Sequence, residues 1–120
     1  MRSVDDAVRA LQELAHLNVL VREPGVLAAG AEDGPLDGLP VVVKDNIAVG
    51  GLPLTAGSPA LEGYRPDTDS GAVRRLRRAG ATVVGQTNMH ELARGTTSDN
   101  AAHGPVRNPR DPGRTAGGSS

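Results

Sequence analysis

The 120-residue sequence contains no cysteine, tryptophan or phenylalanine and only one tyrosine. Without cysteine, the chain forms no disulfide, no thiolate nucleophile and no cysteine-ligated zinc site. Alanine, valine and leucine supply most of its apolar side chains, and its 16 glycines and 9 prolines add turns but little buried area. We therefore expect a small core that forms one flank of a larger one.

Excess charge and long apolar segments are also missing. The 13 basic and 14 acidic side chains leave a net charge of −1, which argues against a general nucleic-acid or membrane surface. The sequence shows neither a basic leader followed by an apolar segment nor an apolar run long enough to cross a bilayer. From these features we expect a cytoplasmic protein with no membrane partner and no direct nucleic-acid partner.

The sequence also has only one lysine, Lys44. A guanidinium keeps its proton in a protein, whereas an amino group can lose one when burial favours its neutral form. Lys44 follows three consecutive valines, residues 41–43, which are typical of a buried strand. The residues alone leave two interpretations open, a lysine that caps a strand end in water and a lysine that acts as a base.

The first third of the chain predicts one helix and a surface connection. Apolar residues recur at helical spacing from residue 3 to about 17, with Ser3 as the N-cap and acidic residues in the first turn. Residues 19–21 favour a short strand. Residues 28–38 are small, acidic and rich in turn signals, so they are expected to run along the surface.

The middle third predicts an α/β unit. The strand ending at Lys44 leads into a glycine- and proline-rich loop at 49–58, then into a helix that Ser70 caps and Gly80 ends. Residues 81–84 favour a second strand, and this order of elements predicts two parallel strands joined by a crossover. The helix is expected to point Val73 and Leu76 inward and its four arginines (Arg74, Arg75, Arg77 and Arg78) into solvent.

The last third has little periodicity. Thr87 is expected to cap a helix over residues 88–93, and residues 95–120 show no repeating pattern. Irregular segments of this length tend to be functional. His90 and Glu91 begin like a zinc-protease helix, but Arg94 stands where the second histidine is required, so no zinc site is expected.

Seven short motifs in a fixed order resemble the amidase signature family. They include Lys-Asp-Asn at 44–46, Thr-Ala-Gly-Ser at 55–58 and Gly-Gly-Ser-Ser at 117–120. The full set covers residues 38–46, 55–58, 71–73, 80–81, 85–91, 104–109 and 117–120. The resemblance implies an α/β fold with a mixed sheet covered by helices. Residues 1–33 would supply a leading helix and connection, and 34–120 the first part of the signature core.

The same resemblance implies a Ser-Ser-Lys triad that hydrolyses amides without a cofactor or metal. Lys44 matches the catalytic lysine, and Ser119, after the motif glycines Gly117 and Gly118, matches the bridging serine, which the family holds through a cis peptide bond. Residues 89–98 would approach the substrate, a small-molecule amide. Its binding residues would be Gly95, Thr96, Thr97 and Ser98.

The family's nucleophilic serine lies downstream of the glycine-serine segment, beyond residue 120, so we expect residues 1–120 alone to be inactive. Partners expected from the resemblance are the remaining amidase chain or a second copy in a homodimer. Two alternatives stay open. The chain would be part of the A subunit of an aminoacyl-tRNA amidotransferase, or a truncated, non-catalytic fragment that docks through strand edges and apolar helix faces.

Overall fold

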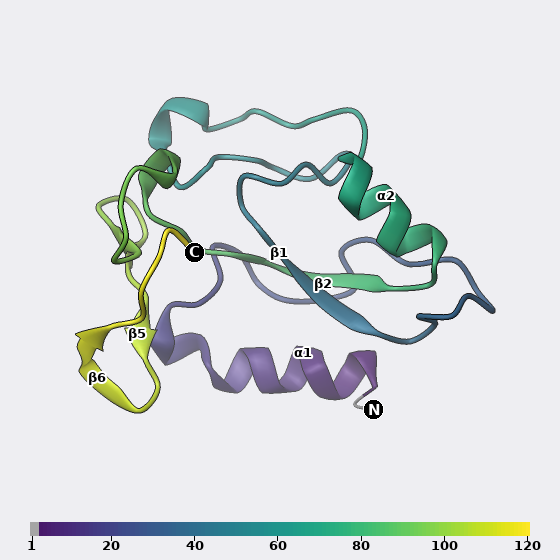
Figure 1. Ribbon diagram of the computed structural model, residues 1–120, viewed down its shortest axis with the longest axis horizontal. Helices are drawn as coiled ribbons and strands as arrows, with labels where there is room; N and C mark the ends of the chain where they lie inside the picture. Colours follow the sequence, from purple (N-terminus) through teal and green to yellow (C-terminus); the bar gives the residue numbers. More distant parts are fainter. Residues whose placement is uncertain (1–2) are drawn as a thin grey trace.

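The computed structural model describes residues 3–120 and has a mixed α/β architecture (Figure 1). Its helices are α1 (Val4–Glu13) and α2 (Gly71–Arg78), with three short 3-10 helices, η1 (Ala15–Leu17), η2 (Pro59–Leu61) and η3 (Glu91–Ala93). Its strands are β1 (Pro40–Lys44), β2 (Thr82–Thr87), β3 (Asp99–Asn100), β4 (Gly104–Pro105), β5 (Arg107–Asn108) and β6 (Asp111–Thr115).

The centre of the fold is the parallel pair β1 and β2, as the sequence predicts. The expectation of a buried strand at the three valines is wrong for Val42, which is 44% exposed, and of the three only Val43 is buried. Lys44 at the end of β1 is in register with Thr87 at the end of β2, and the register shifts once, between Val41 and Val42. The expected strand at residues 19–21 is wrong, because this segment makes only one isolated bridge, from Leu20 to Thr87. The short irregular segment runs antiparallel to β2 and touches it at single residues.

Both predicted helices are present, and serine caps each of them. The Ser3 hydroxyl accepts from the Asp6 N–H, and the Ser70 hydroxyl accepts from the Val73 N–H. α1 ends at Glu13 and is followed by η1. In Figure 1, α1 and α2 lie on opposite sides of the strand pair.

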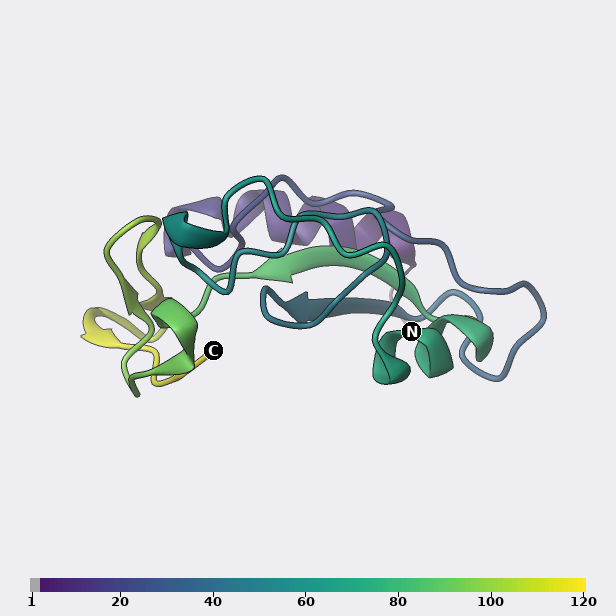
Figure 2. The ribbon, with the colours of Figure 1, turned by 90° about the horizontal axis from the view of Figure 1, so that it is seen from above.

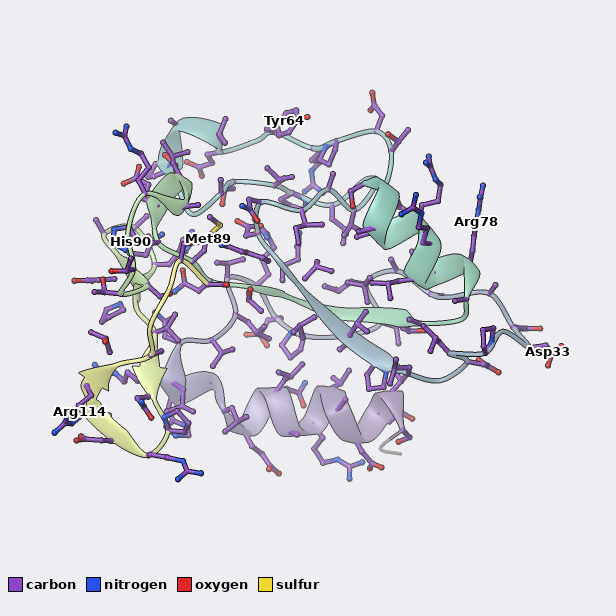
Figure 3. All side chains as sticks on the ribbon, in the orientation of Figure 1. Asp33, Tyr64, Arg78, Met89, His90 and Arg114 are labelled. Atoms are coloured by element: carbon purple, nitrogen blue, oxygen red, sulfur yellow. The ribbon has the colours of Figure 1, made fainter. Side chains whose placement is uncertain are left out.

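The expectation that all four arginines of α2 point into solvent is wrong for Arg77. Its guanidinium donates to the Asp69 carboxylate at 2.8 Å and to the Ala29 carbonyl at 2.9 Å. Arg77 therefore ties α2 to the residue before its cap and to the connection that precedes β1, whereas Arg74, Arg75 and Arg78 are exposed. Figure 3 shows Arg78 pointing away from the molecule.

The core is small and built from valine. Val43, Val49, Val73 and Val83 form one buried cluster that joins β1, β2, α2 and the loop after β1. Five half-buried side chains surround this cluster: Leu27, Ala28, Val41, Ile47 and Leu52. The one aromatic residue of the sequence, Tyr64, is 52% exposed and lies outside this cluster.

The last third differs from the sequence prediction in two ways. The expected helix at 88–93 is wrong, because only η3 forms and Leu92 within it has a left-handed backbone (φ 52°). The buried Asn88 side chain instead donates to the Asn18 and Gly104 carbonyls, which holds its backbone outside a helix. The second difference is that residues 95–120, which show no pattern in sequence, form the antiparallel pairs β3–β4 and β5–β6.

The chain's final residues return to the ends of β1 and β2 (Figure 1). Viewed along a second direction, the molecule is flat, with principal extents of 42 × 31 × 20 Å (Figure 2). Across residues 3–120, no helix combines the length and the apolar character needed to cross a bilayer.

Candidate active site

Lys44 occupies the end of β1, where the strand leaves the valine core. The Val43 side chain before it is buried, and the Lys44 carbonyl accepts from the Ile47 N–H at 2.9 Å, which turns the chain after the strand. Lys44 itself is half-buried. Its Nζ donates to the Ser119 Oγ over 2.5 Å, so the structure brings together the two residues expected to be catalytic.

Ser119 reaches Lys44 on a segment that follows the β5–β6 hairpin. Gly117 has a left-handed backbone (φ 91°), and the Gly118–Ser119 peptide bond is cis. The Ser119 carbonyl accepts from the His90 N–H at 2.8 Å. Met89 and His90 lie at the end of the molecule where the C-terminal segment returns (Figure 3).

Of the four residues expected to bind substrate, Thr96 and Ser98 lie beside the motif glycines, and Gly95 and Thr97 lie beside His90. Ser98 is fully buried, and its hydroxyl donates to the Gly117 carbonyl at 2.7 Å. Thr96 is exposed, and its carbonyl carbon borders Gly118. Gly95 lies against the His90 ring, and the Thr97 hydroxyl is 3.4 Å from His90 Nδ1.

A buried polar network that sequence reasoning missed adjoins Lys44. The Asp45 carboxylate is fully buried and accepts from the Arg22 guanidinium at 2.8 Å and from the Thr55 hydroxyl and N–H. Arg22 also donates to Gln86 Oε1 at 2.9 Å, and the Gln86 amide donates to the Pro53 carbonyl at 2.7 Å. A carboxylate two residues after a run of three valines is the signal that predicts such a partner, since a buried charge requires pairing.

This network fixes the backbone on the C-terminal side of Lys44. The Asp45 N–H donates to the Thr87 carbonyl at 3.2 Å, and the Asp45 carbonyl accepts from the Ala56 N–H at 2.9 Å. Lys44 is therefore held by β-sheet pairing before it and by Asp45 after it. Among residues 3–120, no group of three acidic or histidine side chains has the geometry to hold a metal ion.

The arrangement is a lysine amine in contact with a serine hydroxyl, on glycine-rich backbone that is anchored from several sides. Over residues 3–120, the sequence matches the model of the family described as Amidase. The chain belongs to the amidase family. This match confirms the resemblance seen in the motifs.

Two curated relatives and one solved structure show how this chain compares with other members of the family. It is 43% identical to the A subunit of the glutamyl-tRNA(Gln) amidotransferase of Gloeobacter violaceus, over 98% of this chain and 24% of the relative. It is 46% identical to the indoleacetamide hydrolase of Pseudomonas savastanoi, over 99% of this chain and 27% of the relative.

The solved structure is the A subunit of the glutamyl-tRNA(Gln) amidotransferase of Thermotoga maritima. It superposes with a TM-score of 0.82 at 28% identity, covering 99% of this chain and 30% of that one. The expected fold class is confirmed by this likeness. The chain spans about a quarter of the length of the curated relatives it matches.

Proposed function

We propose that the protein contributes the proton-transfer half of an amidase active site, which hydrolyses a carboxylic amide to a carboxylate and ammonia or an amine. Lys44 and Ser119 are the catalytic residues in this proposal. The observation that carries it is the 2.5 Å contact between Lys44 Nζ and Ser119 Oγ, two residues separated by 75 positions. A proton path is the simplest reason to join the chain's only lysine to a serine across that separation.

The chemistry needs a second serine as nucleophile, which the resemblance places downstream of the glycine-serine segment. Its oxygen attacks the amide carbonyl carbon while its proton passes to Ser119 Oγ, and the Ser119 proton passes to the neutral Lys44 amine. The C–N bond then breaks, and the same path returns a proton to the leaving nitrogen. Water hydrolyses the resulting acyl ester by a repeat of these transfers, which restores both serines.

Lys44 suits this role because a neutral amine accepts a proton through the same contact in which an ammonium donates one. An arginine at this position would keep its proton and block the relay. The exposed Thr96 and its neighbours Gly95 and Thr97 are proposed to border the path by which a small amide substrate arrives. No cofactor is required.

A second candidate function is that of an amidotransferase A subunit, which would release ammonia from glutamine for transfer to a partner's substrate. The 43% identity to the A subunit of a glutamyl-tRNA(Gln) amidotransferase favours it. The indoleacetamide hydrolase is 46% identical and favours a stand-alone amidase. Both candidates use Lys44 and Ser119 in the same way.

The test is ammonia release from a panel of simple amides that includes glutamine. It compares residues 1–120 with a version extended through the downstream coding sequence. We expect activity only in the extended version, reduced about a thousandfold or more by Lys44→Ala, Lys44→Arg or Ser119→Ala. Glutamine as the only substrate, with activity that needs partner subunits, would favour the amidotransferase.

The matched control for Lys44→Arg is Arg78→Lys, which exchanges the same two side chains on the exposed face of α2 and should leave the rate unchanged. Amide hydrolysis by residues 1–120 alone would contradict the assignment of the nucleophile. Wild-type activity in Lys44→Arg would contradict the proton-transfer role of Lys44.

A further inference from the structure

Ser98 makes a hydrogen bond that bears on the position of Ser119. Its side chain is fully buried, and its hydroxyl donates to the Gly117 carbonyl, two residues before Ser119, at 2.7 Å. The Ser98 carbonyl in turn accepts from the Val106 N–H at 3.1 Å. The hydroxyl proton is thus committed to a main-chain carbonyl, so Ser98 has no donor left for a substrate.

Hydrogen bonds fix the backbone on both sides of Gly118. Ser98 holds the Gly117 carbonyl on one side, and the His90 N–H holds the Ser119 carbonyl at 2.8 Å on the other. Between these two bonds, the backbone at Gly118 lies close to the segment 96–98. A Cβ built at Gly118 would lie 2.9 Å from Ser98 N and Oγ and from the Thr96 carbonyl carbon. Glycine is therefore required at 118 for this contact.

These contacts act on the catalytic pair through geometry. Proton transfer between Ser119 and Lys44 requires their heavy atoms to stay within hydrogen-bond distance, and a misplacement of about 1 Å in an active site costs as much as a hundredfold in rate. The Lys44 side of the pair is fixed by β1 and Asp45. The Ser119 side has no regular secondary structure, so side-chain and backbone bonds must fix it.

We propose that Ser98 is a positioning residue, whose hydroxyl holds the Gly117–Ser119 segment so that Ser119 Oγ stays in contact with Lys44 Nζ. This inference rests on the proposed function and refines it. Ser98, first expected to bind substrate, acts through Ser119 instead of touching the substrate.

The kinetic test is Ser98→Ala in the extended protein. We expect kcat to fall about tenfold to a hundredfold with KM changed by less than about twofold, since the relay is misaligned but no substrate contact is lost. A raised KM with unchanged kcat would overturn the proposal in favour of substrate binding. Unchanged kinetics would also overturn it.

Two further variants separate positioning from general stability. Ser70→Ala also removes a serine hydroxyl from a main-chain hydrogen bond, at the start of α2, and should lower stability without lowering kcat. Ser98→Cys keeps a donor at this position, but a weaker one on a larger atom. It should give a kcat between those of the wild type and Ser98→Ala, which keeps the test decisive if Ser98→Ala fails to fold. Wild-type kcat in Ser98→Cys would then overturn the proposal.

A spectroscopic test works even if no amidase activity is found. Because Lys44 is the only lysine, ¹⁵N labelling of lysine at Nζ gives a single side-chain NMR signal from residues 1–120. Ser98→Ala should shift that signal in the same direction as Ser119→Ala, and Ser70→Ala should leave it unchanged. If Ser119→Ala shifts the Lys44 signal and Ser98→Ala does not, the positioning role is overturned, whatever the outcome of the activity assay.

Discussion

Arg22 and Asp45 form an ion pair of 2.8 Å in which the carboxylate side chain is completely buried while the arginine side chain keeps 26% of its surface exposed. The pair joins an irregular segment of the first third of the chain to the residue after Lys44. Removing one partner of such a pair is strongly destabilising, because the other charge is then left buried without compensation.

Arg22→Ala should therefore destabilise the protein by about 3 kcal/mol, the lower end of the range for breaking a buried pair. The measurement is the free energy of unfolding from denaturant titration. The matched control is Arg114→Ala, which breaks the Arg114–Asp111 pair, whose side chains are 81% and 53% exposed. We expect the control to change stability by less than about 0.5 kcal/mol, and equal losses in both variants would contradict the structural role of Arg22.

Gly80 should not tolerate a side chain. It has φ +107°, and a Cβ there would lie 2.6 Å from the Asp37 backbone nitrogen. Gly80→Ala should cost more than about 1 kcal/mol of stability, through both backbone strain and the clash. Gly25→Ala is the control, since no atom lies within 4 Å of a Cβ at that position. A shift in thermal midpoint confined to Gly80→Ala is expected, and similar midpoints would count against the observed turn after α2.

Val73 is the residue through which α2 enters the core, and its side chain is 1% exposed. Val73→Ala removes buried methyl groups and should cost about 2 kcal/mol, because the cavity adds to the lost transfer energy. Val26→Ala makes the same change at a side chain that is 60% exposed and should be nearly neutral. Denaturant midpoints measure both, and a neutral Val73→Ala would contradict the packing of α2 on β1 and β2.

Asp69 should make the protein less stable in acid. Burial alone would raise the pKa of its carboxyl, but hydrogen bonds from the Gly50 N–H and Arg77, with the charges of Arg77 and Arg74, lower the pKa below its ordinary value of 3.8. The stabilisation is thus complete above the unfolded-state pKa and is lost as the pH falls from 3.8 through the lower folded-state pKa.

Denaturant titrations at a series of acidic pH values measure this effect. Asp69→Asn cannot take up the proton, so its stability should fall less steeply than that of the wild type in the window below 3.8. Parallel curves for the two proteins would show that Asp69 does not contribute to the acid response.

Patterns between residues close together in the sequence correctly predicted the two α-helices and the first strand. The spacing of apolar residues and the caps at Ser3 and Ser70 located α1 and α2, and three valines located β1. The helix expected after Thr87 failed because tertiary contacts of Asn88 outweighed a favourable cap. Arg22 could not be assigned a partner, since it lies in a segment without periodicity.

The candidate site depended on a different kind of information. Nothing in the spacing of Lys44 and Ser119 predicts that they meet, and only the resemblance to a family paired them. The roles of His90 and Ser98 were not visible in the sequence, because one acts through its backbone N–H and the other through a bond to a main-chain carbonyl. Such contacts become identifiable only once the chain is folded.

The separation of 75 residues between Lys44 and Ser119 also sets the order in which the site is made. At the usual speed of translation, about 5–20 residues per second, Lys44 is synthesised roughly 4–15 s before Ser119. His90 and Ser98 are synthesised within that interval. Of these four residues Ser119 is therefore made last, when the lysine that it contacts and the two residues that anchor its segment are already present in the nascent chain.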